Sequence, residues 1–213
     1  MFDEIKDKIK NKGLIIFGEV HGTKEIPEML SQFFSEIAKE EDFNVCLEIP
    51  EEFQENPYNF FKMDDNEISD GRNSLEYFNL ISKLKILNKK YNKNIKLFCV
   101  DPIAHSQEEK EDGLAKNILK SLSGKKTFAI IGNIHAYKKI INLAEIKITT
   151  SGSILSDNLN YKMFSINISP KKGEFFNFGL HEIHGQDNSD KDFNKGFDYV
   201  LEIKKVSSCS FLK

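Results

Sequence analysis

Four short apolar runs, each followed by a stretch with helical periodicity, constrain the fold of this chain more than any other feature. The runs lie at residues 14–17, 44–49, 95–100 and 127–132 and read LIIF, NVCLEI, IKLFCV and TFAIIG. Apolar residues after the first run recur at offsets of three and four, which marks one face of a helix: Ile26, Met29, Leu30, Phe33, Phe34 and Ile37. Strands that alternate with helices predict right-handed crossovers and a mostly parallel β-sheet flanked by helices.

Capping boxes indicate where two further helices begin. In this pattern a polar residue precedes the helix and a Glu or Gln follows three positions later. Asn73 with Glu76 predicts the start of one helix, and Ser106 with Glu109 predicts the start of another. Both helices fall between predicted strands, as the alternation requires.

Beyond Tyr161 the pattern changes from helical spacing to alternation. Phe164, Ile166 and Ile168 alternate with polar residues, FFNF follows a Lys-Lys-Gly turn, and DYVLEI has the composition of one more strand. We expect these segments to extend the sheet, with an antiparallel edge as one option. Because 213 residues can bury one core, the sequence predicts an α/β fold in a single domain that spans residues 1–213.

The composition argues against nucleic-acid and membrane partners. The formal net charge is −3 and charges of both signs are interspersed, so no basic stripe that could neutralise phosphates is visible. No apolar run approaches the ~20 residues of a membrane helix, and the segment MFDEIKDKIKNKG is too charged for a signal peptide. We therefore expect a cytoplasmic protein with no membrane segment, in which Cys46, Cys99 and Cys209 are structural.

An ionisable residue lies at the end of each of the four predicted strands. Glu19 and His21 follow the first strand, Glu48 ends the second, Asp101 ends the third, and His135 follows the fourth. Both histidines complete a Gly-x-x-His motif, whose glycine can let a ligand approach the backbone. Since parallel strands direct their carboxyl ends to one edge, where ligands bind, the sequence predicts a polar site at that edge.

The side chains expected at this edge favour hydrolytic chemistry. A carboxylate such as Glu48 is costly to bury unless it is paired, hydrogen-bonded or bound to a metal. A divalent metal (Mn, Co or Zn) held by His21, Glu48 and His135 would activate water. Without a metal, the same residues can act as base and acid on a bound water molecule. The sequence has no Gly-x-Ser-x-Gly elbow and no phosphate-binding glycine motif, so it does not indicate a serine hydrolase or a nucleotide-binding protein.

Other polar residues are secondary candidates. Arg72 and Lys24 are suited to binding a substrate carboxylate or an oxyanion, and Asp101 can face the same edge as a substrate-binding residue. Their structural alternatives are an exposed loop position for the two cations and an Asp-Pro turn for Asp101. His181 and His184, in HEIHG, lack the spacing of a zinc-protease helix, so an edge or loop feature is favoured over metal or haem binding.

One long irregular stretch separates the second strand from the next helix. It runs from Pro50 to about Arg72 and mixes acidic residues with Tyr58, Phe60 and Phe61. Long loops without their own periodicity are often functional lids or binding loops. We therefore predict a lid here, and not a domain boundary.

Four segments in this order, FGEVHGTKE, CLEIP, EDGLAKNIL and IGNIHAYK, resemble the superfamily of erythromycin esterases, ChaN-like haem-uptake proteins, and TraB and Tiki proteins. The resemblance covers residues 14 to about 140 and implies an α/β fold with a site formed by His21, Glu48 and His135. For the Tiki branch it implies metal-dependent peptide cleavage, and for the esterase branch a histidine base near Glu19 and His21 that opens a lactone. ChaN-like members bind haem, which would make the histidines axial ligands without turnover.

The chain also departs from the esterase pattern. Esterase relatives tend to carry Arg where this sequence has Lys24, and an Arg-Asp pair where it has Glu111 and Asp112. Their substrate therefore does not carry over to this chain.

The preferred hypothesis from the sequence is a hydrolase of ester or peptide bonds. His21, beside Glu19, would activate water directly or through a metal, Glu48 would orient the water or ligate the metal, and His135 would assist as second ligand or acid. The aromatic stretch 53–61 would cover a small-molecule or peptide substrate. The alternative is a haem- or metal-binding protein without catalysis.

Overall fold

The computed structural model describes residues 2–63, 70–143, 146–184 and 192–212. Helices (α), short 3-10 helices (η) and strands (β) occur along the chain in the following order: α1 (Phe2–Ile9), β1 (Leu14–Glu19), α2 (Glu25–Glu40), β2 (Phe43–Pro50), η1 (Glu51–Phe53), η2 (Pro57–Lys62), α3 (Leu75–Tyr91), β3 (Lys96–Asp101), α4 (Gln107–Ser121), β4 (Lys126–Gly132), α5 (Asn133–Ala136), β5 (Ile141–Leu143), β6 (Ile146–Ile148), α6 (Ser151–Leu159), η3 (Asn160–Lys162), β7 (Met163–Pro170), β8 (Lys172–Phe176), β9 (Leu180–His184) and β10 (Tyr199–Ile203).

The predicted α/β fold is confirmed, with the four apolar runs as strands β1 to β4. Over the described residues the main sheet has six strands in the order β10-β7-β1-β4-β2-β3, and every neighbouring pair is parallel. Because β1, β4 and β2 are adjacent, the chain segments that follow them meet at one edge. The sheet therefore brings the predicted site residues together, as the strand-end argument requires.

The C-terminal strands β7 and β10 extend the sheet in parallel, and the antiparallel strands considered from the sequence lie beside the main sheet and not within it. β7 pairs with β1, and β10 pairs with β7 in the same direction. Antiparallel pairing occurs instead in two separate hairpins, β5 with β6 and β8 with β9. Most side chains of β8 and β9 are exposed or half-buried, so this hairpin has no apolar face to place in the main sheet.

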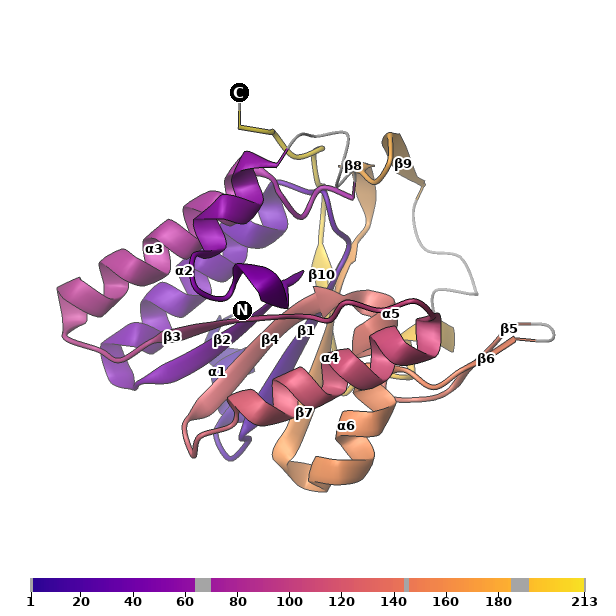
Figure 1. Cartoon of the computed structure of the whole chain (residues 1–213), viewed down its shortest axis with the longest axis horizontal. Coiled ribbons are helices and arrows are strands. Elements are labelled where there is room, and N and C mark those ends of the chain that lie inside the picture. The colour runs from indigo at the N-terminus through magenta and orange to yellow at the C-terminus, as the bar shows by residue number, and fades with distance from the viewer. Residues whose placement is uncertain (1, 64–69, 144–145, 185–191, 213) are drawn as a thin grey trace.

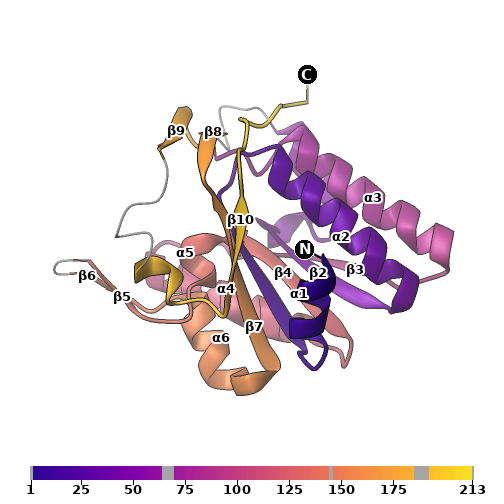
Figure 2. The same cartoon turned by 180° about the vertical axis from the view of Figure 1, so that it is seen from behind.

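Helices cover both faces of the sheet, as Figures 1 and 2 show from opposite sides. α1, α2 and α3 pack on one face and contribute to the larger core, while α4, α5 and α6 pack on the other. Phenylalanines fill the centre of the larger core. The ring of Phe128 in β4 lies 5.4 Å from that of Phe34, 5.5 Å from that of Phe43 and 5.7 Å from that of Phe33, measured between ring centres.

The predicted aromatic lid is largely a part of this core. Its regular part forms η1 and η2, and the side chains of Phe60 and Phe61 are buried against α3. The Phe61 ring lies 5.7 Å from the ring of Phe78 in an edge-on contact. Burial of these rings in the core is more favourable in free energy than their exposure above a substrate would be. Residues 64–69 of the predicted lid lie outside the described residues.

Helix α3 begins one residue later than its capping pattern predicted. Ser74, and not Asn73, is the cap, because the Ser74 side chain accepts a hydrogen bond from the backbone N of Tyr77 at 3.4 Å. Asn73 and Ser74 are adjacent and both are of a type that caps helices, so the sequence alone locates the start of the helix only to within one residue. The second cap is confirmed, since Ser106 accepts a hydrogen bond from the backbone N of Glu109 at 3.1 Å.

After β10 the chain returns across the beginnings of α2 and α3, and this C-terminal segment (residues 207–211) ties the two helices together. The backbone N of Ser207 donates to the Glu25 carboxylate at 2.7 Å, and that of Ser210 donates to the Glu76 carboxylate at 3.0 Å. The backbone N of Cys209 donates to the carbonyl of Gly22 at 2.8 Å. The segment therefore holds the loop after β1 and the beginning of α3 in place.

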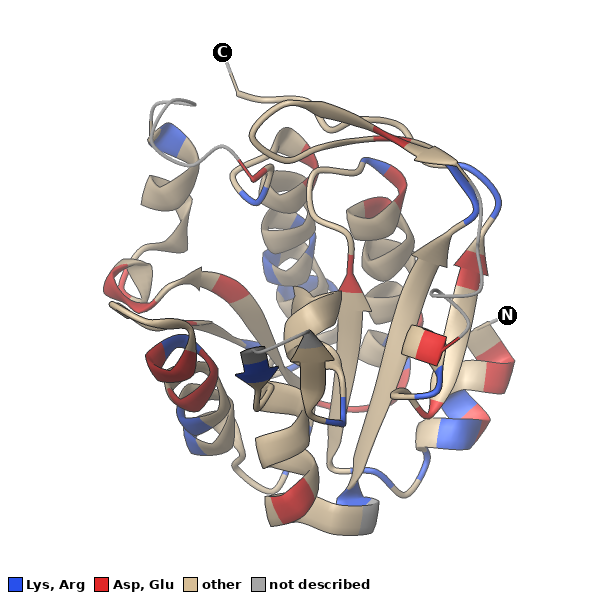
Figure 3. Cartoon of the chain, turned by 90° about the vertical axis from the view of Figure 1, so that its right-hand side faces the viewer, with Lys and Arg blue, Asp and Glu red and all other residues tan. Residues whose placement is uncertain are grey.

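The distribution of charged residues and the state of the cysteines agree with what the composition predicts. In Figure 3, acidic and basic positions are interspersed on the helices. Cys46, Cys99 and Cys209 are buried and unpaired, so the structural role predicted for them is confirmed. A search of the described residues found no helix with the length and apolar character needed to cross a membrane.

Replacing Phe128 with Ala should destabilise the protein by about 3–5 kcal/mol, because the substitution removes a ring from the middle of the core and leaves a cavity. Urea unfolding measured by circular dichroism would show the loss. Phe178 provides the matched control, since it is 78% exposed and its replacement with Ala should change stability by less than about 0.5 kcal/mol. Equal effects of the two substitutions would contradict the assigned core.

Candidate functional site

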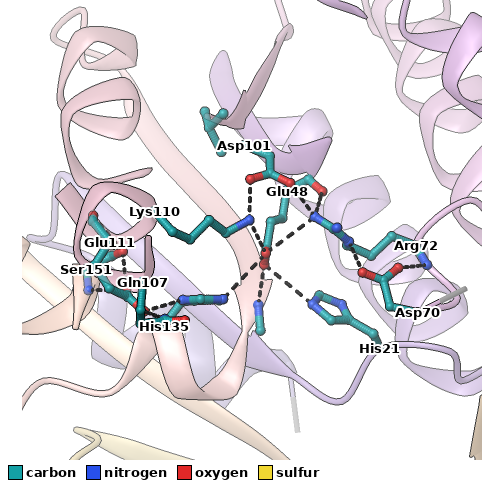
Figure 4. A network of polar contacts seen from close by, with 12 residues as sticks. His21, Glu48, Asp70, Arg72, Asp101, Gln107, Lys110, Glu111, His135 and Ser151 are labelled. Carbon is teal, nitrogen blue, oxygen red and sulfur yellow. Dashed lines mark hydrogen bonds and ion pairs between the residues drawn. The ribbon is translucent and has the colours of Figure 1, made fainter. Parts of the chain in front are cut away.

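Glu48, at the end of β2, is the centre of a buried polar network (Figure 4). Only 6% of this residue is exposed. Five nitrogen atoms from separate parts of the chain surround its carboxylate: the backbone N of Gly132 at 2.8 Å, Nζ of Lys110 at 3.1 Å, Nη1 of Arg72 at 3.4 Å, Nε2 of His21 at 3.4 Å and Nε2 of His135 at 3.6 Å. The cost of burying this charge is therefore offset by hydrogen bonding and by opposite charge.

His21 is oriented by a second buried carboxylate. Its Nδ1 lies 2.6 Å from Oε1 of Glu19, and the hydroxyl of Tyr77, from α3, donates to the same oxygen. Oε2 of Glu19 is buried and has no hydrogen-bond partner among the described residues. Because Glu19 accepts a hydrogen bond from Nδ1–H, the other ring nitrogen of His21 is directed to Glu48.

His135 has the same arrangement on the other side of Glu48. Its Nδ1 lies 2.7 Å from Oε1 of Glu111, a residue of α4. Glu111 is 1% exposed and also accepts hydrogen bonds from Gln107, at 2.6 Å, and from the backbone N and hydroxyl of Ser151, at 2.7 and 2.6 Å. The site thus contains two carboxylate–imidazole pairs whose free nitrogens converge on one carboxylate. Figure 4 shows the pair of His135 with Glu111 and the approach of both imidazoles to Glu48.

Arg72 and Lys110 supply fixed positive charge. Nη1 of Arg72 donates to Asp101 at 2.6 Å and to the carbonyl of Glu48 at 2.8 Å, while its Nε donates to Asp70 at 2.6 Å. Lys110 contacts Asp101 as well as Glu48. The alternative of an exposed loop position for Arg72 is wrong, because only 15% of its side chain is exposed and three carboxylates surround it. Asp101 likewise has a role beyond an Asp-Pro turn, because it contacts both Arg72 and Lys110.

The electrostatics of the network favour charged imidazoles. Burial lowers the pKa of His21, but the carboxylates of Glu19 and Glu48 outweigh burial and raise its pKa to about 10. The pKa of His135 is also raised despite burial, by Glu48 and by the carboxylate on its Nδ1. Burial raises the pKa of Glu48, yet the charges of His135, His21 and Arg72 lower it well below the usual range. At neutral pH the His21 imidazole is therefore protonated beside an ionised Glu48.

The glycine of the second Gly-x-x-His motif leaves space for both imidazole rings. A Cβ atom on Gly132 would lie 3.1 Å from Nε2 of His21 and 3.3 Å from the His135 ring. Its backbone N also donates to Glu48. A side chain at this position would thus displace the catalytic candidates, which explains in physical terms why glycine stands there.

A divalent metal fits the donor set poorly in this arrangement. The described residues contain no group of three or more His, Cys, Asp or Glu arranged to hold a metal ion. Arg72 and Lys110 contact Oε1 of Glu48, so a metal bound to that oxygen would lie against two cations. The cavity beside His21, Glu48 and Tyr77 is also small, at about 10 Å³, far below the ~300–1,000 Å³ of most ligand pockets. A haem group would require this region to open.

Not every candidate from the sequence lies in the network. Lys24 precedes α2, where its backbone N donates to the carbonyl of Ser207 at 3.0 Å, and its side chain has no contact with Glu48 among the described interactions. His105 is exposed. His181 and His184 lie on the exposed β9, which agrees with an edge feature.

The sequence reasoning missed Tyr77, Lys110, Glu111 and Ser151. Tyr77 was assigned to an apolar helix face and Glu111 was noted only as a departure from the esterase pattern. A signal for Glu111 was present, because it precedes Leu114, Ala115 and Ile118 at helical spacing and so lies on the buried stripe of α4. An acid on a buried stripe indicates a partner in the core.

Comparison with known proteins supports the fold. No protein-family model matches the chain, and no curated protein is significantly similar to it. Among solved structures, a succinoglycan biosynthesis protein is 13% identical, with a TM-score of 0.74 over 98% of this chain and 92% of that chain. A protein from Bacillus cereus is 11% identical, with a TM-score of 0.75 over 100% of this chain and 93% of that chain.

A mutant erythromycin esterase in its open conformation has a similar structure as well. It is 7% identical, with a TM-score of 0.65 over 91% of this chain and 82% of that chain. At these identities the likeness shows the fold alone.

Replacing Arg72 with Met should destabilise the protein by about 3–5 kcal/mol at neutral pH, because it leaves Glu48, Asp70 and Asp101 without their shared cation. Urea unfolding at pH 7 measures the loss. Arg72→Lys is the matched control, since it keeps the charge while losing the planar group that binds two acids, and its cost should be smaller. A cost below about 1 kcal/mol for Arg72→Met would contradict the assigned role.

Proposed function

We propose that the protein is a hydrolase that cleaves an ester or peptide bond by acid–base chemistry. One observation carries this proposal: the Nδ1 atoms of His21 and His135 are held by buried carboxylates while both Nε2 atoms face Glu48. Histidines held in this way are oriented for proton transfer. The fold shared with an erythromycin esterase supports the proposal by analogy only.

Each residue has a defined role in the proposed reaction. His21 removes a proton from a water molecule that Glu48 orients by accepting its second hydrogen bond, and Glu19 stabilises the imidazolium that forms. The water oxygen bonds to the substrate carbonyl carbon, and the bond from this carbon to the leaving group breaks. His135 donates the proton that the leaving group takes. Arg72 and Lys110 keep Glu48 ionised throughout.

The raised pKa of His21 determines when it can act as a base. With a pKa of about 10 it is protonated at neutral pH and becomes a base only as pH rises toward that value. The proposal therefore predicts that kcat/KM for a neutral ester rises above pH 8 and continues to rise toward pH 10. His21→Ala should lower kcat/KM by about 10²–10⁴-fold.

Two variants check this assignment. Glu19→Gln removes the carboxylate that raises the pKa of His21, so the rising limb should move to lower pH while activity is retained in part. His105→Ala, at an exposed position, should leave the profile unchanged. A rising limb centred near pH 6.5 in the wild type, or one that Glu19→Gln does not move, would rule out His21 as the base.

Metal-dependent hydrolysis is the second candidate, because two imidazole nitrogens and a carboxylate converge within 3.6 Å. Elemental analysis of protein purified without added metal or chelator separates the two mechanisms. The acid–base proposal predicts substoichiometric Mn, Co, Zn and Fe and no haem absorbance. Near-stoichiometric metal that is lost in His21→Ala would contradict the acid–base proposal and support a metal-dependent mechanism. A Soret band would support haem binding instead.

We further propose that the protein acts in the cytoplasm on a small-molecule or peptide substrate. Three buried and unpaired cysteines support this location, since thiols remain reduced there. The small cavity at Glu48 supports a narrow reacting group.

A further inference from the structure

A second and larger cavity lies at the same edge of the sheet as the proposed catalytic residues. It has a volume of about 170 Å³, compared with about 10 Å³ for the cavity beside Glu48, and so has room for a small organic group. The end of β7, the β8–β9 hairpin and the segment at Phe193 form its walls. Figure 2 shows β8 continuing from the end of β7. We call this cavity the edge pocket.

The edge pocket and the catalytic network share two chain segments. Val20, which lines the pocket, lies between Glu19 and His21 in the sequence. Asn133, which also lines it, lies between Gly132 and His135. A molecule in the pocket is therefore adjacent to the two backbone segments that carry the imidazoles.

The lining of the edge pocket excludes charged groups. None of the described residues that line it is ionisable, whereas the neighbouring network contains several carboxylates and cations. Phe175, Ile183 and Phe193 supply apolar and aromatic walls. A charged group placed here would be desolvated without a partner, which is unfavourable.

Asn167 is a polar residue in the lining of the pocket. It is 4% exposed, and its Nδ2 donates to Oδ1 of Asn194 at 2.6 Å. Its own Oδ1 is buried and has no hydrogen-bond partner within the described parts of the chain. A buried acceptor without a partner is costly, so a ligand that donates a hydrogen bond to it is favoured.

From this geometry we infer that the edge pocket binds the non-reacting part of the substrate, an uncharged and partly aromatic or aliphatic group that carries an amide N–H or a hydroxyl. The inference rests on the proposed hydrolase function and narrows its substrates. Esters or peptides with neutral donor groups beside the scissile bond are selected, and those with a carboxylate or phosphate there are rejected.

Binding of three matched probes tests the inference without requiring turnover. Hydrocinnamamide donates a hydrogen bond, benzylacetone has a methyl group in place of the amide nitrogen, and hydrocinnamate is an anion. Ligand-observed NMR titration should show hydrocinnamamide binding about fivefold more tightly than benzylacetone, as expected for one additional hydrogen bond. Hydrocinnamate should bind most weakly of the three.

Variants localise the binding. Asn167→Leu should remove the preference for hydrocinnamamide over benzylacetone, and Ile183→Trp should block binding of both by filling the pocket. Glu182→Trp is the matched control, because adjacent residues of a strand point to opposite faces, and it should leave binding unchanged.

Two outcomes would overturn the inference: equal affinity for hydrocinnamamide and benzylacetone, or binding that Ile183→Trp does not reduce. The catalytic proposal fails separately. His21→Ala should lower kcat/KM by about 10²–10⁴-fold and still bind hydrocinnamamide. Unchanged turnover in this variant would contradict the catalytic proposal, whereas wild-type protein that turns over an ester but does not bind hydrocinnamamide would contradict the inferred pocket alone.

Discussion

The buried charge of Glu48 is the constraint on which the rest of the site depends. A carboxylate at the end of an apolar strand must be compensated, and the compensation comes from Gly132, Arg72, Lys110 and the two imidazoles. These partners belong to β4, α4, α5 and the loops after β1 and before α3. Because the partners come from both helical layers, the requirement to neutralise one side chain positions segments on either face of the sheet relative to each other.

Sequence patterns predicted the sheet and the main catalytic candidates for related physical reasons. A strand buried on both faces is a continuous apolar run, and the rule that parallel strands end at one edge then places His21, Glu48 and His135 together. Local patterns carry less information about direction and partner. The strands after residue 161 were expected, yet alternation in one strand does not specify whether its neighbour runs parallel, as β7 and β10 do.

The residues missed from the sequence are those whose role depends on tertiary contacts. Tyr77 has the spacing of an ordinary core aromatic, and only the position of α3 against β1 turns its hydroxyl to Glu19. Arg72 was a substrate-binding candidate from the sequence, but it follows an irregular stretch with no periodicity, so nothing local indicated that it is buried among three acids. The segment predicted as a lid instead packs into the core. The free energy gained by burying the Phe60 side chain favours this position over an exposed one above a substrate.

The position of segment 207–211 near the end of the sequence affects the order in which parts of the site form during synthesis. It bridges the loop after β1 and the first turn of α3, the two places that deliver His21 and Arg72 to Glu48. During synthesis from the N-terminus, the ribosome releases these residues only after both loops and the whole sheet have emerged. Most of the sheet therefore emerges from the ribosome before this stretch, and the contacts that fix the loops beside Glu48 form only after residues 207–211 have left the exit tunnel.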